Sequence, residues 1–236
     1  MTCAVCYTAV TNGSRTSDFI SRFVATWMAN PPGAPCDLWV ACNGGPLLSE
    51  QVLMFAPMSA RMFPRVNTPG WDLDGYFDAA RGPCASYEEV LWLGESVYFH
   101  REGWLKRLVE ARQKYGPGFY GPFGSFNVRP HLQTSAFFCP PGLLLQYPVR
   151  PKDRAERMAF EHSDRALWCR VAERAMPVKL VTFDGEWDTR LWRYPQNILW
   201  RGDQSNLLMM NNHAQGWEDA SPLVKFQWSS KADGVQ

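Results

Sequence analysis

The chain has 236 residues and carries 24 basic against 23 acidic side chains, a formal net charge of +1 at pH 7. That length can bury a self-supporting core as one α/β domain, and the near-neutral charge supplies no broad positive field, which argues against nucleic acid as a partner. Seven cysteines scattered through apolar sequence are typical of reduced thiols, and no run approaches the roughly 20 apolar residues of a transmembrane segment. We therefore expect a soluble cytoplasmic protein.

Strands and helices are predicted to alternate through the first half of the chain. Residues 3–10 form an apolar, β-branched run, and the turn residues that follow lead into a helix that begins near Ser17 or Asp18. The later elements of this half are expected at residues 37–42 (strand), 47–55 (helix), 61–66 (strand), 75–81 (short helix), 89–94 (strand) and 104–115 (helix). This order indicates a mostly parallel central sheet with helices on both faces.

The second half is predicted to begin with a long loop. Residues 116–130 are rich in glycine, proline and aromatic residues, which favours a substrate-facing loop. The elements expected after it are a strand at 133–139, one long helix at 154–174, a strand at 177–183 and a helix near 218–227. We therefore predict one α/β domain over residues 1–236.

Polar residues gather at the carboxyl ends of the predicted strands, where open α/β sheets bind ligands. They are Thr8, Asn43, residues 67–74 and the pair Glu95-Ser96. The triplet Asp72-Leu73-Asp74, in an extended or turn conformation, could direct two carboxylates at one Mn²⁺ or Mg²⁺ ion that neutralises a diphosphate. Alternatively, Asp72 or Asp74 caps a helix that begins at Gly75.

Glu95-Ser96 ends the most apolar strand of the first half. Glu95 would meet Asp72 and Asp74 only if their strands were neighbours. The alternative is an ordinary polar turn at a strand end.

Two further patterns favour structural roles. Cys3 and Cys6 have the C-x-x-C spacing, but they lie inside a predicted strand and no second pair follows at zinc-finger spacing. The eleven tryptophans offer faces that suit sugar rings, although most are expected to fill the core.

Candidate catalytic groups lie in the second half. Glu161, beside His162, could take a proton from an acceptor hydroxyl; alternatively it is a charge that faces water from a long helix. Asp203 is a further candidate catalytic carboxylate. The four histidines are dispersed, and His213 is the one that could ligate a metal, although an isolated histidine is more often simply hydrogen-bonded or solvent-facing.

The order of these residues resembles the GT-A glycosyltransferases, especially the rhamnan-synthesis-type and large-virus sugar transferases. The residues that carry the resemblance are Asn67, Gly70, Asp72 and Tyr76, followed by Tyr87, Val90, Leu91, Leu93, Gly94, Glu95 and Ser96. The resemblance covers about residues 3–187, and residues 131–138 look like the strand that lies under the acceptor. Many GT-A enzymes have D-x-D where this chain has Gly94-Glu95-Ser96.

The resemblance implies a single GT-A-like domain whose nucleotide-binding part spans about residues 1–115 and whose acceptor-side part spans about 116–236. It implies a nucleotide-sugar donor, a glycan or other hydroxyl acceptor, and Mn²⁺ or Mg²⁺ as cofactor. The residues it assigns are Asn43, Asn67 and Asp72 for the nucleotide, Glu95 and His213 for the metal, and Glu161 as the base. Thr8, Asp74 and Ser96, at the same strand ends, are expected to complete the nucleotide-sugar site.

The sequence thus predicts a glycosyltransferase. If Glu161 deprotonates the acceptor for direct attack, the single displacement inverts the anomeric carbon. The alternative is a non-catalytic carbohydrate-binding protein on the same fold. A hydrolase or another nucleotide-binding enzyme is less favoured, because the chain has no G-x-S-x-G elbow and no P-loop.

Overall fold

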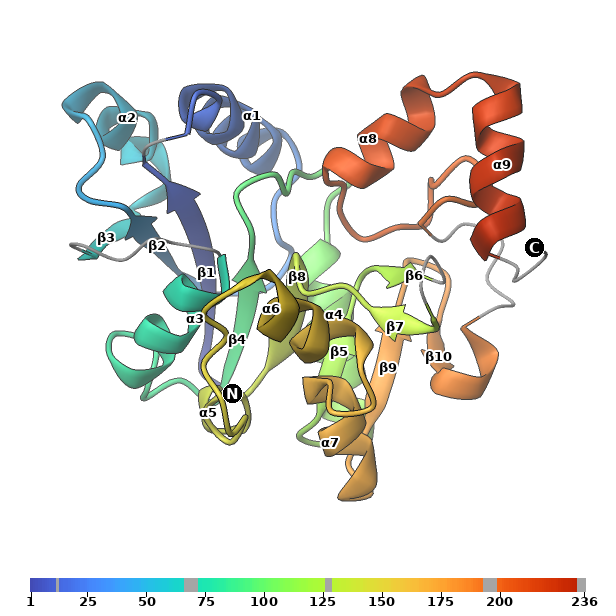
Figure 1. Ribbon diagram of the computed structural model, residues 1–236. Coiled ribbons are helices and arrows are strands. Elements are labelled where there is room, and N and C mark those ends of the chain that lie inside the picture. The colour runs from blue at the N-terminus through green and yellow to red at the C-terminus, as the bar shows by residue number, and fades with distance from the viewer. Residues whose placement is uncertain (12, 66–71, 126–128, 193–198, 233–236) are drawn as a thin grey trace.

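The computed structural model describes residues 1–11, 13–65, 72–125, 129–192 and 199–232 (Figure 1). The expectations placed on Asn67 and Gly70 therefore lie outside the described residues. Among the described residues, no helix combines the length and the apolar character needed to cross a bilayer.

An eight-stranded sheet runs through the middle of the molecule. Its strands, from one edge to the other, are β10 (Glu186–Asp188), β9 (Val178–Val181), β5 (Phe119–Gly121), β8 (Ala136–Cys139), β4 (Glu89–Leu93), β1 (Cys3–Val10), β2 (Asp37–Asn43) and β3 (Arg61–Arg65). Four of the seven strand pairs are parallel, which confirms the mostly parallel sheet. The carboxyl ends of β1, β2, β3 and β4 consequently lie at one edge of the sheet.

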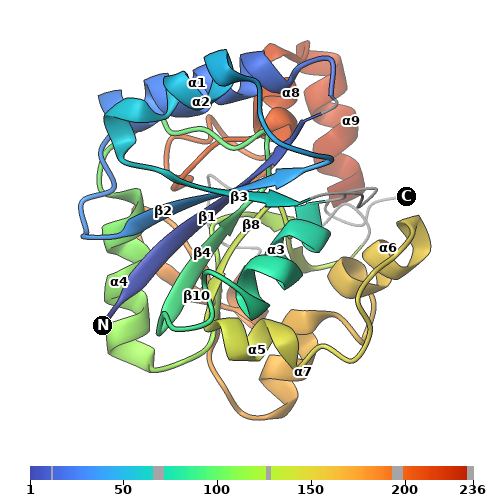
Figure 2. The ribbon, with the colours of Figure 1, turned by 90° about the vertical axis from the view of Figure 1, so that its left-hand side faces the viewer.

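Helices cover both faces of this sheet, as predicted (Figure 2). The face that carries the first core cluster is covered by α1 (Thr16–Ala29), α2 (Ser49–Met54), α4 (Trp104–Tyr115) and α8 (Asn212–Asp219). The opposite face is covered by α3 (Asp72–Arg81), α5 (Pro141–Leu145), α6 (Arg154–His162) and α7 (Leu167–Glu173). The remaining elements are α9 (Pro222–Ala232), the short 3₁₀ helices η1 (Ala56–Met58) and η2 (Thr189–Leu191), and the two-stranded ribbon of β6 (Gly124–Ser125) and β7 (His131–Leu132).

Strand β1 explains why the central strands are apolar along their whole length. Val5 and Tyr7 belong to the core on one face, whereas Ala4 and Cys6 belong to the core on the other. Alternate side chains of a strand point to opposite faces, so a sheet covered by helices on both sides buries every position.

The C-x-x-C pair and the tryptophans have the structural roles expected of them. Cys3 and Cys6 lie within β1, are buried and are free thiols, and burial raises the pKa of Cys3. Trp92, Trp104 and Trp192 are fully buried.

The loop predicted at residues 116–130 is wrong in part, because β5 occupies a central position in the sheet between β8 and β9. Phe119 is buried and stacks on Phe137 with 5.2 Å between ring centroids. The glycine content reflects close packing here: a Cβ added at Gly121 would lie 2.9 Å from the side chain of Leu132. Glycine in a strand often marks such a close approach.

Two predicted helices are each divided in the structure. The helix expected at 154–174 ends at His162, because Ser163 is extended and its hydroxyl donates to the carbonyl of Ala159 at 2.6 Å; α7 then begins at Leu167. The helix expected near 218–227 is the end of α8 and the start of α9. Pro222 is the first residue of α9, a position that proline favours.

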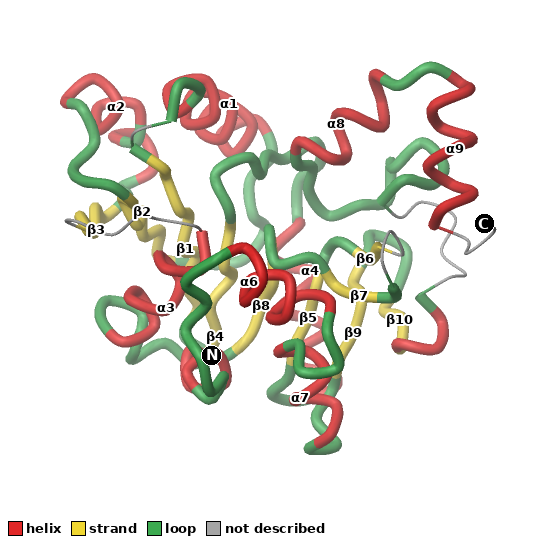
Figure 3. The backbone as a smooth tube through the Cα atoms, viewed as in Figure 1, coloured by secondary structure: helices red, strands yellow, loops and turns green. Residues whose placement is uncertain are grey.

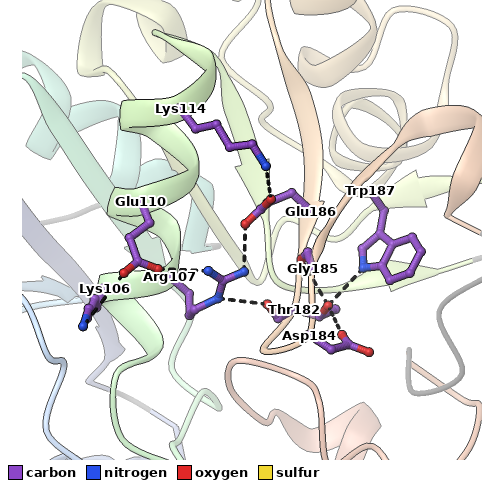
Figure 4. A network of polar contacts seen from close by, with 9 residues as sticks. All are labelled: Lys106, Arg107, Glu110, Lys114, Thr182, Asp184, Gly185, Glu186 and Trp187. Atoms are coloured by element: carbon purple, nitrogen blue, oxygen red, sulfur yellow. Dashed lines mark hydrogen bonds and ion pairs between the residues drawn. The ribbon is translucent and has the colours of Figure 1, made fainter.

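The hairpin of β9 and β10 is attached to α4 by charged side chains (Figure 4). Glu186 accepts from Arg107 at 2.8 Å and from Lys114 at 3.0 Å. Burial raises the pKa of Glu186, but the hydrogen bonds from these two cations outweigh burial and lower it overall. Within the hairpin, the indole of Trp187 donates to the hydroxyl of Thr182 at 3.0 Å.

Candidate functional site

Asp72 and the loop after β4 meet at the carboxyl edge of the sheet. Strands β1 and β2 lie between β3 and β4, so the expected condition of neighbouring strands is not met. The contact forms because α3 begins at Asp72 and packs over β1 and β2. Gly94 makes room for it: a Cβ added there would lie 2.6 Å from Asp72 Oδ2. The backbone of Glu95 hydrogen-bonds the Asp72 carboxylate.

The carboxylates of Asp72 and Glu95 interact in a poorly solvated place. Burial raises the pKa of Asp72, and the charge of Arg157 and the backbone of Glu95 oppose the rise. Burial and the charge of Asp72 raise the pKa of Glu95 to about 7. A cation beside the pair would relieve this repulsion, and oxygen ligands suit Mg²⁺ and Mn²⁺. The oxygen donors suit the expected cation, but Asp72, Glu95 and His213 are not among the described residues whose ligand atoms all lie within 4.8 Å of one another.

The two carboxylates of the Asp72-Leu73-Asp74 triplet do not share a ligand position. Helix α3 begins at Asp72, which contradicts both an extended triplet and a helix that starts at Gly75. Residues two apart in an α-helix point about 200° apart. Asp74 accordingly accepts from Arg150 Nε at 2.6 Å, in an ion-pair network that includes Asp78.

Thr8 and Asn43 are buried at the ends of β1 and β2, beneath the first turn of α3. The hydroxyl of Thr8 has no hydrogen-bond partner among the described residues, and a Cβ added at Gly75 would lie 2.8 Å from it. Asn43 Oδ1 accepts from the guanidinium of Arg65, which also pairs with Asp78. The nucleotide-binding roles of Thr8, Asn43 and Asp74 stay predictions.

A cavity of about 210 Å³ lies where the ribbon of β6 and β7 meets α6 and α8. Figure 3 shows α6 beside β7. The lining residues are Ser125, His131, Gln133, Arg154, Arg157, Met158, Glu161, His162, Trp200 and His213. The cavity thus contains the predicted base and the predicted metal-ligating histidine, together with two other histidines.

Glu161 is held in one orientation at the C-terminal turn of α6. Its Oε2 accepts from the Thr134 hydroxyl at 2.5 Å, and its Oε1 lies 3.5 Å from His131 Nε2 and 3.8 Å from His162 Nε2. Burial raises the pKa of Glu161, but the hydrogen bond from Thr134 and the nearby imidazoles of His131 and His162 outweigh burial and lower it overall. With a side chain 14% exposed, Glu161 does not simply face water.

His213 reaches the cavity because its helix is fixed at the N-terminus. Asn211 caps α8: its Oδ1 accepts from the backbone N–H groups of His213 and Ala214, each at 3.0 Å. The amide of Asn211 also donates to Gln133 Oε1 at 3.2 Å, which links α8 to the segment before β8. Burial lowers the pKa of His213, and the charge of Glu161 opposes the effect. The imidazole is therefore mainly neutral, the form that ligates metals.

The other two predicted site residues lie outside the cavity lining. Asp203 is exposed, and its carboxylate accepts from the backbone N–H of Ser205 at 3.0 Å. The carbonyl of Ser96 accepts from Arg22 at 3.0 Å, and Arg22 also donates to Gln215 of α8 at 2.6 Å. This arginine connects α1 with α8, which lie side by side in Figure 1.

His131 and His162 were not predicted as partners of Glu161, and Arg157 was not predicted as part of the site. One signal was available: His162 directly follows Glu161. His131 is 30 residues earlier and shares no motif with them, so only the fold brings it to the cavity.

No protein-family model and no curated protein matches the chain. Several solved structures are similar to the chain. TarS 1–349 of S. aureus has a TM-score of 0.51 and 12% identity, with 71% of this chain and 55% of that chain covered. A putative glucose-1-phosphate thymidylyltransferase from Bacillus anthracis, in complex with a sucrose, has a TM-score of 0.51 and 13% identity, with 74% and 84% covered. The galactosyltransferase LgtC, in complex with donor and acceptor sugar analogs, has a TM-score of 0.46 and 10% identity, with 69% and 68% covered.

The chain thus spans about half the length of the TarS fragment. At these identities the first two likenesses concern the fold, and they confirm the GT-A-type fold that the sequence resemblance implied.

Proposed function

We propose that this chain is a glycosyltransferase that moves a sugar from a nucleoside-diphosphate donor to a hydroxyl group of a glycan or similar acceptor. The observation that carries the proposal is the placement of Glu161: a largely buried carboxylate with a lowered pKa, in a cavity beside the carboxyl edge of a GT-A-type sheet. Such edges are where open α/β sheets bind ligands.

Glu161 would act as the general base. An ionised carboxylate accepts the proton of the attacking hydroxyl, and the hydrogen bond from Thr134 holds the carboxylate so that little orientation is lost on binding. The deprotonated oxygen would attack the anomeric carbon directly while the nucleoside diphosphate leaves. One displacement inverts that carbon, so we propose an inverting reaction.

The donor would lie between the cavity and the loop after β4. Arg154 and Arg157 line the cavity, and guanidinium groups pair well with phosphate oxygens. Arg157 also acts electrostatically on Asp72, which connects the cavity with the Asp72 and Glu95 carboxylates. These carboxylates would hold Mn²⁺ or Mg²⁺, which when bound offsets the charge of the diphosphate. His213 is the proposed further ligand.

A donor panel tests the proposal. UDP-, GDP- and dTDP-sugars are incubated with the protein, an acceptor mixture and Mn²⁺ or Mg²⁺, and release of the nucleoside diphosphate is measured. Glu161→Gln should reduce turnover at least about 100-fold and leave the donor Kd nearly unchanged, because the base acts in the chemical step. Glu173→Gln, an exposed glutamate of α7, is the matched control and should behave as wild type.

Equal loss of turnover and donor affinity in Glu161→Gln would contradict the role of the base. Binding of free glycans without nucleotide, metal or turnover would favour the non-catalytic carbohydrate-binding protein instead. Isothermal titration separates that outcome from an inactive preparation, and NMR of the product anomer tests inversion.

A further inference from the structure

We propose that His131, Glu161 and His162 form a binding site for a zinc-class transition-metal ion, distinct from the cation expected at Asp72 and Glu95. One ligand atom from each of the three residues lies within 4.8 Å of the others. The site itself does not depend on the proposed transferase activity, because metal binding can be measured without any substrate.

The hydrogen bonding of His131 fixes which of its nitrogens is available. Nδ1 lies 2.7 Å from the carbonyl oxygen of Arg129, which can only accept, so Nδ1 carries the proton and donates. In the neutral ring, Nε2 then presents its lone pair. This arrangement, in which a carbonyl orients the far nitrogen of the ring, is the usual outer-sphere support of a metal-bound histidine.

The lone pair of His131 Nε2 faces an anionic oxygen. Nε2 is 3.5 Å from Glu161 Oε1, the side chain of His131 is 1% exposed, and Nε2 has no hydrogen-bond partner among the described residues. Two electron-rich atoms facing each other away from water need a positive charge between them. That charge is either a proton or a metal ion.

The imidazole of His162 favours a metal ion over a proton as this positive charge. His162 Nε2 lies 3.8 Å from the same Oε1, and the rings of His131 and His162 have centroids 4.1 Å apart. A proton serves one pair of atoms, and protonating both rings would place two like charges in contact. A single divalent ion serves all three ligands together.

The geometry suits tetrahedral coordination. With metal–ligand bonds near 2.0–2.1 Å, the ligand atoms of a tetrahedral site lie about 3.3 Å apart. The 3.5 and 3.8 Å separations from Glu161 require shifts of only a few tenths of an ångström, and the two histidine ligand atoms, which lie within 4.8 Å of each other, would approach as the ion binds. Two imidazoles and one carboxylate with an open fourth position are a ligand set that zinc adopts. Arg154 and Arg157 line the same cavity, so water or an anion would be the occupant of the open position.

Titration of the whole metal-free chain with Zn²⁺ tests the site. Wild type should bind one equivalent, and Glu161→Gln and His162→Ala should each weaken binding at least tenfold. His100→Ala is the matched control, since His100 lies outside the cavity lining and should leave the affinity unchanged. His131→Ala is also expected to weaken binding. If circular dichroism shows that this buried substitution unfolds the chain, the test rests on the Zn²⁺ affinity of His162→Ala, because His162 is partly exposed.

Co²⁺ identifies the ligand atoms. The proposed nitrogen and oxygen set gives a tetrahedral visible spectrum without thiolate charge-transfer bands, and His162→Ala should change that spectrum. Thiolate bands would mean that free cysteines hold the metal and would overturn the proposal. So would the absence of Zn²⁺ binding, or His162→Ala binding as tightly as wild type. A chain that binds Zn²⁺ but transfers no sugar even after a chelator has removed the ion would refute the transferase and leave the metal site standing.

Discussion

Glu89, the first residue of β4, should make the stability of this protein depend on pH near neutrality. Its side chain is 0% exposed, and Arg112 of α4 contacts Oε1, but Oε2 has no hydrogen-bond partner among the described residues. Burial raises the pKa of Glu89 from 4.5 to about 7, an effect that Arg112 only partly offsets. The native state therefore prefers the neutral carboxyl group.

The sign of the effect follows from proton binding. Between pH 4.5 and about 7 the folded state holds the proton of Glu89 and the unfolded state has released it. The free energy of unfolding consequently falls as pH rises: the stabilisation is fully present below pH 4.5 and is lost by about pH 7. The difference between 4.5 and 7, at about 1.4 kcal/mol for each pH unit, amounts to roughly 3 kcal/mol.

Urea unfolding at about pH 5 and about pH 8 measures this contribution. At the lower pH, Glu89→Gln resembles the protonated wild type. At the higher pH, wild type carries a costly buried charge that the variant lacks. The difference in the free energy of unfolding, variant minus wild type, should therefore increase by roughly 2 to 3 kcal/mol from the lower pH to the higher. Other titrating groups are common to both proteins and cancel, and Glu173→Gln should show no such gain. A variant whose stability difference from wild type is the same at both pH values would refute the reasoning.

Two further substitutions test the packing that positions the site. Gly94→Ala introduces a methyl group 2.6 Å from Asp72 Oδ2, so it should displace that carboxylate and weaken Mn²⁺ binding measured by electron paramagnetic resonance; unchanged Mn²⁺ affinity would mean that Asp72 is not a ligand. Trp104→Ala removes a buried indole that stacks on Phe99 at 4.0 Å, and it should cost about 3–5 kcal/mol in urea unfolding. A cost below about 1 kcal/mol would show that this cluster contributes little to the core.

Local patterns were sufficient to predict most elements of the first half of the chain. The strand expected at 3–10 and the helix expected at 104–115 agree with β1 and α4, because buried strands and amphipathic helices impose their own periodicity on the sequence. Strand β5 could not be found in this way. It has three residues among glycines and prolines, and its place in the sheet is set by β8 and β9, which lie far along the chain.

Individual residues of the candidate site could be predicted from the sequence, but not which of them lie together in the folded chain. Glu161 and His213 could be singled out from their sequence surroundings, whereas their meeting depends on the cap that Asn211 provides and on its link to Gln133. Asp72 contacts the loop after β4 because α3 crosses the intervening strands β1 and β2, an arrangement that was not predicted. Contacts of this kind depend on the tertiary arrangement, which spacing in the sequence does not encode.

The proposed base and the proposed metal site both use the same atom, Oε1 of Glu161. Thr134 occupies Oε2 of Glu161, so Oε1 is the oxygen that remains for chemistry, and it is also the oxygen that faces His131 and His162. A carboxylate oxygen that shares its electrons with a zinc-class ion is a poor proton acceptor. If both proposals hold, metal-loaded molecules cannot use Glu161 as a base, and turnover should fall in proportion to occupancy and return when a chelator removes the ion. The histidines would then give the cell a way to silence the enzyme without altering its fold.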